Sequence, residues 1–196
     1  MTTEENKSLL FDCGSTDVGA VGEYRLMPFL KQQGIAVIDA AIVSHMDADH
    51  VNGIKELLLR MPPYSGREAA MRDYNGSILI AELVLPKVAE PSESYLELVA
   101  LAEEKQVAVL FLEAGERLME QSRSVELTCL SPQNAVKSEN DTSLVFLLRT
   151  KEAEIWLMGD AGTKVERSLF QTIETLRAEA ENETDAAEKL CILKAG

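Results

Sequence analysis

The sequence predicts a layered domain of mixed class, α/β or α+β. Apolar, β-branched runs of strand length recur along the chain, and helical segments separate many of them. One such run leads directly into a cluster of histidine and aspartate residues and then into a helix. With 196 residues and 46% hydrophobic content, the chain has the size of one ordinary domain. We therefore expect a single domain over residues 1–196.

Strands and helices alternate in the first half of the chain. Apolar runs predict strands over residues 8–12, 35–43, 78–85 and 107–112. Apolar spacing predicts helices over residues 23–33, 52–61 and 92–106. The polar residues 64–77 predict a loop or a partly ordered insertion. Gly34 ends the first helix, and Ser92 can cap the third, whose apolar side includes Leu96, Val99 and Leu101.

The second half is richer in strands. Residues 125–130 predict one strand, and residues 142–149 and 154–158 predict a hairpin around a short polar turn. A long amphipathic helix over residues 163–181 and a last strand over residues 189–194 complete the chain. Periodicity alone supports α/β or α+β and no finer architecture.

The only two histidines of the chain lie in one stretch, together with two aspartates. His45, Asp47, Asp49 and His50 follow the strand over residues 35–43 and precede a helix. Imidazole and carboxylate groups together suit zinc, manganese or iron. His45 and Asp47 project to the same side if the extended geometry of the strand continues. The alternative is a purely structural role, in which Asp47 or Asp49 only caps the helix.

Two further aspartates end apolar strands. Asp160 follows a strand and precedes Ala161-Gly162, so a turn or a helix cap would explain it locally. Asp12 ends the first strand, where its local chemistry suits a support for a metal ligand and a turn-forming residue about equally. Beside a histidine and aspartate cluster, Asp160 becomes a candidate bridging carboxylate.

These motifs resemble the metallo-β-lactamase superfamily, whose signature is His-x-His-x-Asp-His after a strand. Asp47 stands where that signature has its second histidine. Residues 9–14 resemble the early strand that ends in Asp-x-Gly, and residues 156–160 resemble the late strand that ends in Gly-Asp. Within the superfamily, residues 45–53, 140–145, 159–160 and 193–196 resemble the soluble domain of ComEC/Rec2 competence proteins.

The resemblance implies a four-layer αββα sandwich with two divalent metal ions, manganese or zinc. His45 and Asp47 would hold one metal, Asp49 and His50 the other, and Asp160 would bridge them. Asp49 would also hold the attacking water and is the expected catalytic residue. The hard oxygen of Asp47 shifts the expected preference away from zinc and toward manganese or magnesium.

The superfamily site normally includes one more histidine in the middle of the chain and one near its end, and neither is present. The sequence stops at the run that precedes His-His-Gly-Ser in ComEC-type proteins, and an early family strand is also missing. We therefore expect a fragment of a longer protein, truncated at both ends, with impaired metal binding and activity.

The resemblance implies a phosphodiesterase or nuclease that acts on single-stranded DNA during competence-related DNA uptake, within a membrane protein and on the extracytoplasmic face. Otherwise we expect a cytoplasmic protein. A hydrolase of small esters, thioesters or lactones and a non-catalytic domain with an incomplete site are the alternatives. The formal charge of −14 disfavours a tight DNA-binding module but not a nuclease, because bound metal ions supply local positive charge. No apolar run reaches the roughly 20 residues of a membrane helix, so we expect no membrane contact by this segment.

Overall fold

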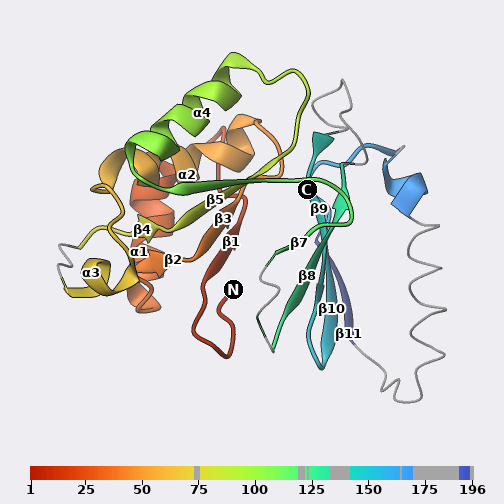
Figure 1. The fold of residues 1–196 in the computed structure, drawn as a ribbon, viewed down its shortest axis with the longest axis horizontal. Helices are drawn as coiled ribbons and strands as arrows, with labels where there is room; N and C mark the ends of the chain where they lie inside the picture. Colours follow the sequence, from red (N-terminus) through yellow and green to blue (C-terminus); the bar gives the residue numbers. More distant parts are fainter. Residues whose placement is uncertain are drawn as a thin grey trace. The chain divides into compact units, whose positions relative to one another are not determined.

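The structure is a computed structural model that describes residues 1–72, 76–118, 122, 124–132, 142–163, 165–169 and 190–194. The chain forms two compact units. Unit 1 consists of Met1–Pro86 and Glu90–Phe111, and unit 2 consists of Lys87–Ala89 and Leu112–Gly196. Figure 1 follows both units from red at the N-terminus to blue at the C-terminus.

A four-stranded sheet forms the framework of unit 1. Its order is β1 (Leu9–Phe11), β3 (Ala40–Ile42), β5 (Glu82–Pro86) and β6 (Ala108–Leu112). β1 pairs with β3 and β3 with β5 in parallel, with Phe11 opposite Ile42. A second, two-stranded parallel sheet joins β2 (Val37–Ile38) to β4 (Leu79–Ile80). These strands confirm the four predicted strands of this half.

Two of the predicted strands are interrupted. The run over residues 35–43 divides into β2 and β3 at Asp39, and the run over residues 78–85 divides into β4 and β5 at Ala81. At Asp39 the backbone N–H donates to Ser8 O, and the Asp39 carboxylate accepts the Ser8 N–H. The strand changes its pairing partner at this point because Asp39 is hydrogen-bonded to the residue before β1.

The helices of unit 1 are η1 (Gly22–Leu26), α1 (Met27–Gln32), α2 (Ala48–Arg60), α3 (Arg67–Arg72) and α4 (Glu93–Glu104). The predicted helix over residues 23–33 is confirmed, although its first turn is a π-helix, and Gly34 follows it at φ +71°. α2 begins before the predicted Asn52, so it includes Asp49 and His50. α3 lies in the segment that was predicted to be a loop or a partly ordered insertion. In Figure 1, α2 and α4 lie above β1, β3 and β5, and α1 lies to the left of these strands.

The buried side of α4 differs from the predicted one. Ser92 caps the helix as predicted, since its Oγ accepts the Tyr95 N–H at 3.3 Å. The buried residues are Tyr95, Leu98 and Ala102, whereas Leu96 is 54% exposed. The Tyr95 hydroxyl donates to Pro86 O at 2.8 Å, so the end of β5 helps to select the buried side.

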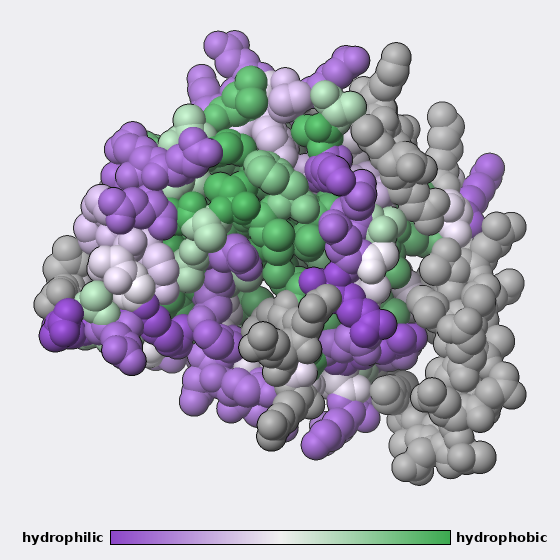
Figure 2. Space-filling model, in the orientation of Figure 1, coloured by the Kyte–Doolittle hydropathy of each residue, from purple (hydrophilic) through white to green (hydrophobic). Residues whose placement is uncertain are grey.

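On the face in view, unit 1 shows an apolar area within polar surroundings (Figure 2). Among the residues that the structure describes, no helix is long and apolar enough to cross a membrane.

Unit 2 contains a five-stranded sheet of order β11-β10-β9-β8-β7. Its strands are β7 (Arg117–Leu118), β8 (Glu126–Ser131), β9 (Val145–Arg149), β10 (Ala153–Leu157) and β11 (Leu190–Lys194). β9 and β10 form the predicted hairpin, with Trp156 opposite Leu147, and β11 runs parallel to β10. β7 has no counterpart in the sequence prediction. Residues 163 and 165–169 of the predicted long helix are helical, and the remainder of that helix lies outside the described residues.

Asp39 connects three segments of unit 1 and provides a prediction about pH. Burial by itself raises the pKa of Asp39, but hydrogen bonds from Ser8 N–H, Arg67 and Lys7 hold it below its ordinary 3.8. A carboxyl group whose pKa is lowered by folding adds stability above its unfolded pKa, and this stability is lost as the pH falls through the folded value. Asp39→Asn should therefore reduce the dependence of the free energy of unfolding on pH below about pH 4.

Urea unfolding at a series of pH values tests this expectation, with Asp17→Asn in an exposed loop as the control. The control should keep the acid-dependent loss of stability. Equal pH dependence in the unchanged protein and in Asp39→Asn would contradict the assignment.

Candidate metal centre

The candidate ligands of unit 1 lie in the turn between β3 and α2. β3 is fully buried, and Val43 N–H still donates to Val84 O of the neighbouring strand. The backbone of Asp47 is extended, at φ −65° and ψ 145°, and α2 begins at the next residue. The His50 N–H donates to Asp47 O at 2.9 Å, which places His50 in the first turn of α2. The strand-to-helix turn expected from the sequence is present.

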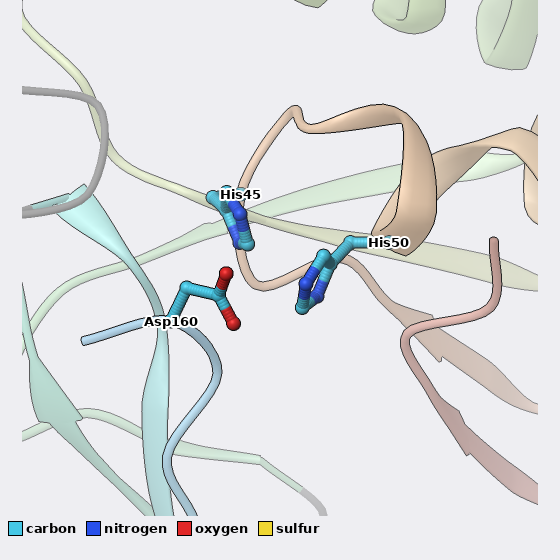
Figure 3. A group of neighbouring side chains, drawn as sticks. All are labelled: His45, His50 and Asp160. Atoms are coloured by element: carbon cyan, nitrogen blue, oxygen red, sulfur yellow. The ribbon is translucent and has the colours of Figure 1, made fainter. Parts of the chain in front are cut away.

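The two imidazoles lie side by side in this turn (Figure 3). Their ring centroids are 4.1 Å apart, and His45 and His50 are only 2% and 6% exposed. His45 Nε2 lies 3.2 Å from Asp47 Oδ2, and His50 Nε2 lies 3.9 Å from Asp49 Oδ2. Unit 1 therefore brings four of the five candidate ligands together as two imidazole–carboxylate pairs.

The helix-cap alternative accounts for the position of Asp47 but not for its side chain. Asp47 occupies the N-cap position of α2, yet its side chain makes no capping hydrogen bond. Its carboxylate instead faces the Nε2 of His45. Asp49 lies in the first helical turn, where the helix dipole favours a negative charge. Both carboxylates are about half exposed, in contrast to the buried imidazoles.

Asp12 supports this turn from the end of β1. Its side chain is 7% exposed, and it accepts hydrogen bonds from Ser44 N–H at 2.7 Å, Ser44 Oγ at 2.8 Å and His50 Nδ1 at 3.0 Å. Its backbone is also left-handed, at φ +50°, which aspartate tolerates better than most residues. Asp12 therefore fills both of the roles that its local sequence left open, the turn former and the support for a candidate ligand.

The donor set fits a divalent cation. A carboxylate can only accept hydrogen bonds, so the His50 Nδ1 that faces Asp12 carries a proton, and a neutral His50 presents an Nε2 lone pair. That nitrogen faces the Asp49 carboxylate, which is also an acceptor. A cation between the two groups satisfies both, and a histidine held by a carboxylate on its other nitrogen is typical of metal ligands.

Residues 13–14 hold the first turns of α2 through close backbone contacts. The Cys13 N–H donates to His50 O at 2.7 Å, and the Gly53 N–H donates to Cys13 O at 2.8 Å. A Cβ atom on Gly14 would lie 2.3 Å from Ala48 O, and one on Gly53 would lie 2.8 Å from Cys13 Sγ. Sequence reasoning did not assign Gly53, although a glycine in a helix interior, which costs about 1 kcal/mol relative to alanine, was a signal of close packing.

The Cys13 thiol is not a nucleophile of this site. Burial, together with the negative charges of Glu56 and Asp12, raises the pKa of Cys13 to about 11. Because nucleophilic attack requires the thiolate, Cys13 contributes its backbone and its volume to the support of α2.

Asp160 belongs to unit 2, and Figure 3 labels it together with the two histidines. It follows the end of β10, as predicted, after Gly159 at φ +53°. The Ala161 N–H closes the turn by donating to Met158 O at 3.3 Å. Asp160 is partly buried. Its convergence with the four candidate ligands of unit 1 stays a prediction.

Comparisons with known proteins agree with the resemblance that the sequence motifs indicate. Residues 2–70 match the family model of the metallo-beta-lactamase superfamily. The chain is 29% identical over 163 residues to ComE operon protein 3 of Bacillus subtilis (strain 168), across 82% of this chain and 18% of that protein. It is 26% identical over 175 residues to Recombination protein 2 of Haemophilus influenzae (strain ATCC 51907 / DSM 11121 / KW20 / Rd), across 88% of this chain and 18% of that protein.

The chain thus spans less than a fifth of the length of these two relatives. Among solved structures, it is similar to a diphosphatase from the PhnP family, with a TM-score of 0.43 and 16% identity over 77% of this chain and 47% of that chain. The family match and the two relatives confirm that the chain resembles the metallo-β-lactamase superfamily and, within it, ComEC/Rec2-type proteins, and they confirm the predicted α/β fold class.

Proposed function

We propose that this chain is a metal-dependent hydrolase domain that cleaves phosphodiester bonds in single-stranded DNA. The observation that carries the proposal is the pair of imidazole–carboxylate contacts in one turn, His45 with Asp47 and His50 with Asp49. The family match over residues 2–70 supports a hydrolase. The similarity to Recombination protein 2 supports a nucleic acid as the substrate.

The proposed ligands are His45, Asp47, Asp49, His50 and Asp160. His45 and Asp47 would hold one divalent cation, Asp49 and His50 a second, and Asp160 would be shared between them. When bound, such cations polarise a phosphoryl or ester oxygen and lower the pKa of a water molecule. This chemistry needs no nucleophilic side chain, which agrees with the protonated state of Cys13.

The residues of the chain have separate tasks in this proposal. Asp12 holds His50 in one orientation from its Nδ1 side. Asp49 is half exposed at the start of α2, where it would hold the attacking water as well as a metal, whereas His50 beside it is buried. Residues 13–14 keep the first turns of α2 in place. We further propose that the chain acts as one domain within a longer membrane protein, on its extracytoplasmic side.

Metal titration and cleavage assays on the metal-stripped protein test the proposal. Calorimetry with manganese and with zinc measures binding, and a labelled single-stranded oligonucleotide measures phosphodiester cleavage. Cleavage that requires added metal and is lost in His45→Ala would support the nuclease. Metal-dependent turnover of a thioester or lactone, without oligonucleotide cleavage, would favour a small-molecule hydrolase, and no binding at saturating metal would favour a non-catalytic domain.

Metal preference provides a second test of the ligand assignment. Because Asp47 offers a hard anionic oxygen, manganese should support activity better than zinc does. Asp47→His replaces this oxygen with a nitrogen ligand and should shift the ratio of zinc to manganese affinity toward zinc by about tenfold or more. The matched control is Asp17→His, which changes an exposed loop residue in the same way. A clear preference of the unchanged protein for zinc would contradict the role of Asp47.

A further inference from the structure

Ser44 lies at the centre of the hydrogen bonds around both imidazoles. Its side chain is fully buried, and its Oγ lies 2.8 Å from Asp12 Oδ2, 3.0 Å from His45 Nδ1 and 3.4 Å from His50 Nδ1. Its backbone N–H donates to the other oxygen of Asp12 at 2.7 Å. One serine thus contacts the supporting carboxylate and both histidines.

Counting protons assigns the direction of each hydrogen bond. The hydroxyl of Ser44 has a single proton, and the Asp12 carboxylate has none to donate, so that proton lies between Ser44 Oγ and Asp12 Oδ2. The contact between Ser44 Oγ and His45 Nδ1 then requires a proton on the nitrogen. The order of donation is therefore from His45 Nδ1 to Ser44 Oγ and from Ser44 Oγ to Asp12.

We propose that Ser44 is a positioning residue that fixes the tautomer of His45. Asp12 holds the proton of His50 on Nδ1 directly, and Ser44, which donates to Asp12, extends this effect to His45. Both imidazoles then present Nε2 toward the aspartates of the turn. The inference rests on the proposed function only in treating Nε2 as the atom that binds the cation.

Asp47 favours the opposite tautomer. Its Oδ2 lies 3.2 Å from His45 Nε2, where its negative charge would favour a proton on that nitrogen. Without the Ser44 hydroxyl, the proton of a neutral His45 would move from Nδ1 to Nε2, beside the negative charge of Asp47. A cation would then have to displace this proton, and its affinity would fall.

Nitrogen NMR of the metal-free protein tests the inference directly. The chain contains only two histidines, so ¹⁵N-histidine labelling gives signals from His45 and His50 alone, and His45→Gln assigns them. For the neutral imidazoles, we expect a protonated Nδ1 on both rings. In Ser44→Ala, the proton of His45 should move to Nε2 while His50 keeps its own, and manganese affinity should fall about tenfold or more.

Two further variants separate the tautomer from folding. Ser44→Thr keeps the hydroxyl and should restore the tautomer of the unchanged protein. Ser143→Ala is the matched control, because Ser143 is also fully buried and its Oγ has no hydrogen-bond partner within the described part of the chain. This control should leave both imidazoles unchanged.

A His45 that carries its proton only on Nε2 in the unchanged protein would overturn the inference, whether or not Ser44→Ala folds. An unchanged His45 tautomer in Ser44→Ala, or the same change in Ser143→Ala, would also overturn it. Failure of the unchanged protein to bind metal or to cleave DNA would contradict the proposed function, but it would leave the tautomer measured without metal intact.

Discussion

Gly14→Ala is expected to destabilise the protein by about 3 kcal/mol and to weaken metal binding. An added Cβ would lie 2.3 Å from Ala48 O and 2.4 Å from the carbonyl carbon of Asp49. These are backbone atoms of the first turn of α2, so a rotamer change cannot relieve the overlap. Either the loop after β1 or the start of α2 has to move, and such a shift displaces Asp49 and His50.

Urea unfolding measures the loss of stability, and calorimetric titration with manganese measures the effect on the site. Gly19→Ala is the matched control, because a Cβ on Gly19, in the same loop, would meet nothing within 4 Å. Gly19→Ala should be neutral or slightly stabilising, since it mainly restricts the unfolded chain. If the two variants unfold at the same urea concentration, the close contact between Gly14 and α2 is not present in solution.

Asp12→Ala is expected to have the second large effect, on stability and on metal binding together. It removes the acceptor for Ser44 N–H, Ser44 Oγ–H and His50 Nδ1–H, in a place where the side chain is almost fully buried. Each buried donor left without an acceptor costs about 1–3 kcal/mol. Loss of the carboxylate that supports a ligand histidine typically weakens metal affinity about 10- to 100-fold.

Asp12→Asn and Asp17→Ala refine this experiment. Asparagine fills the same space, but its NH₂ group would face one of the donors that now point at the carboxylate, Ser44 or His50. Manganese affinity should therefore fall, with a smaller loss of stability than in Asp12→Ala. Asp17→Ala removes an exposed carboxylate from the loop that follows and should change neither quantity. Manganese affinity in Asp12→Ala equal to that of the unchanged protein would show that Asp12 does not support the site.

Local signals in the sequence were sufficient for the strand, turn and helix around the candidate site. Strand and helix periods depend on residues a few positions apart, and ligand chemistry depends on residue type, so His45, Asp47, Asp49 and His50 could be selected without coordinates. The hairpin of β9 and β10 is local in the same sense, and it was predicted. The start of α2 was placed too late because the capping position of Asp47 is a backbone property that residue type does not determine.

The tertiary structure decided which residues support that site. Parallel pairing puts Phe11 of β1 opposite Ile42 of β3, so both strands end at the same edge of the sheet, and Asp12 meets Ser44 there. Asp12 and His50 are 38 positions apart, and no periodicity spans such a distance. The buried side of α4 and the fit of Gly14 against α2 likewise depend on neighbours distant in sequence. The sequence by itself determined the strands, the turn and the chemistry of its side chains, whereas long-range packing alone decided which groups hold those side chains in place.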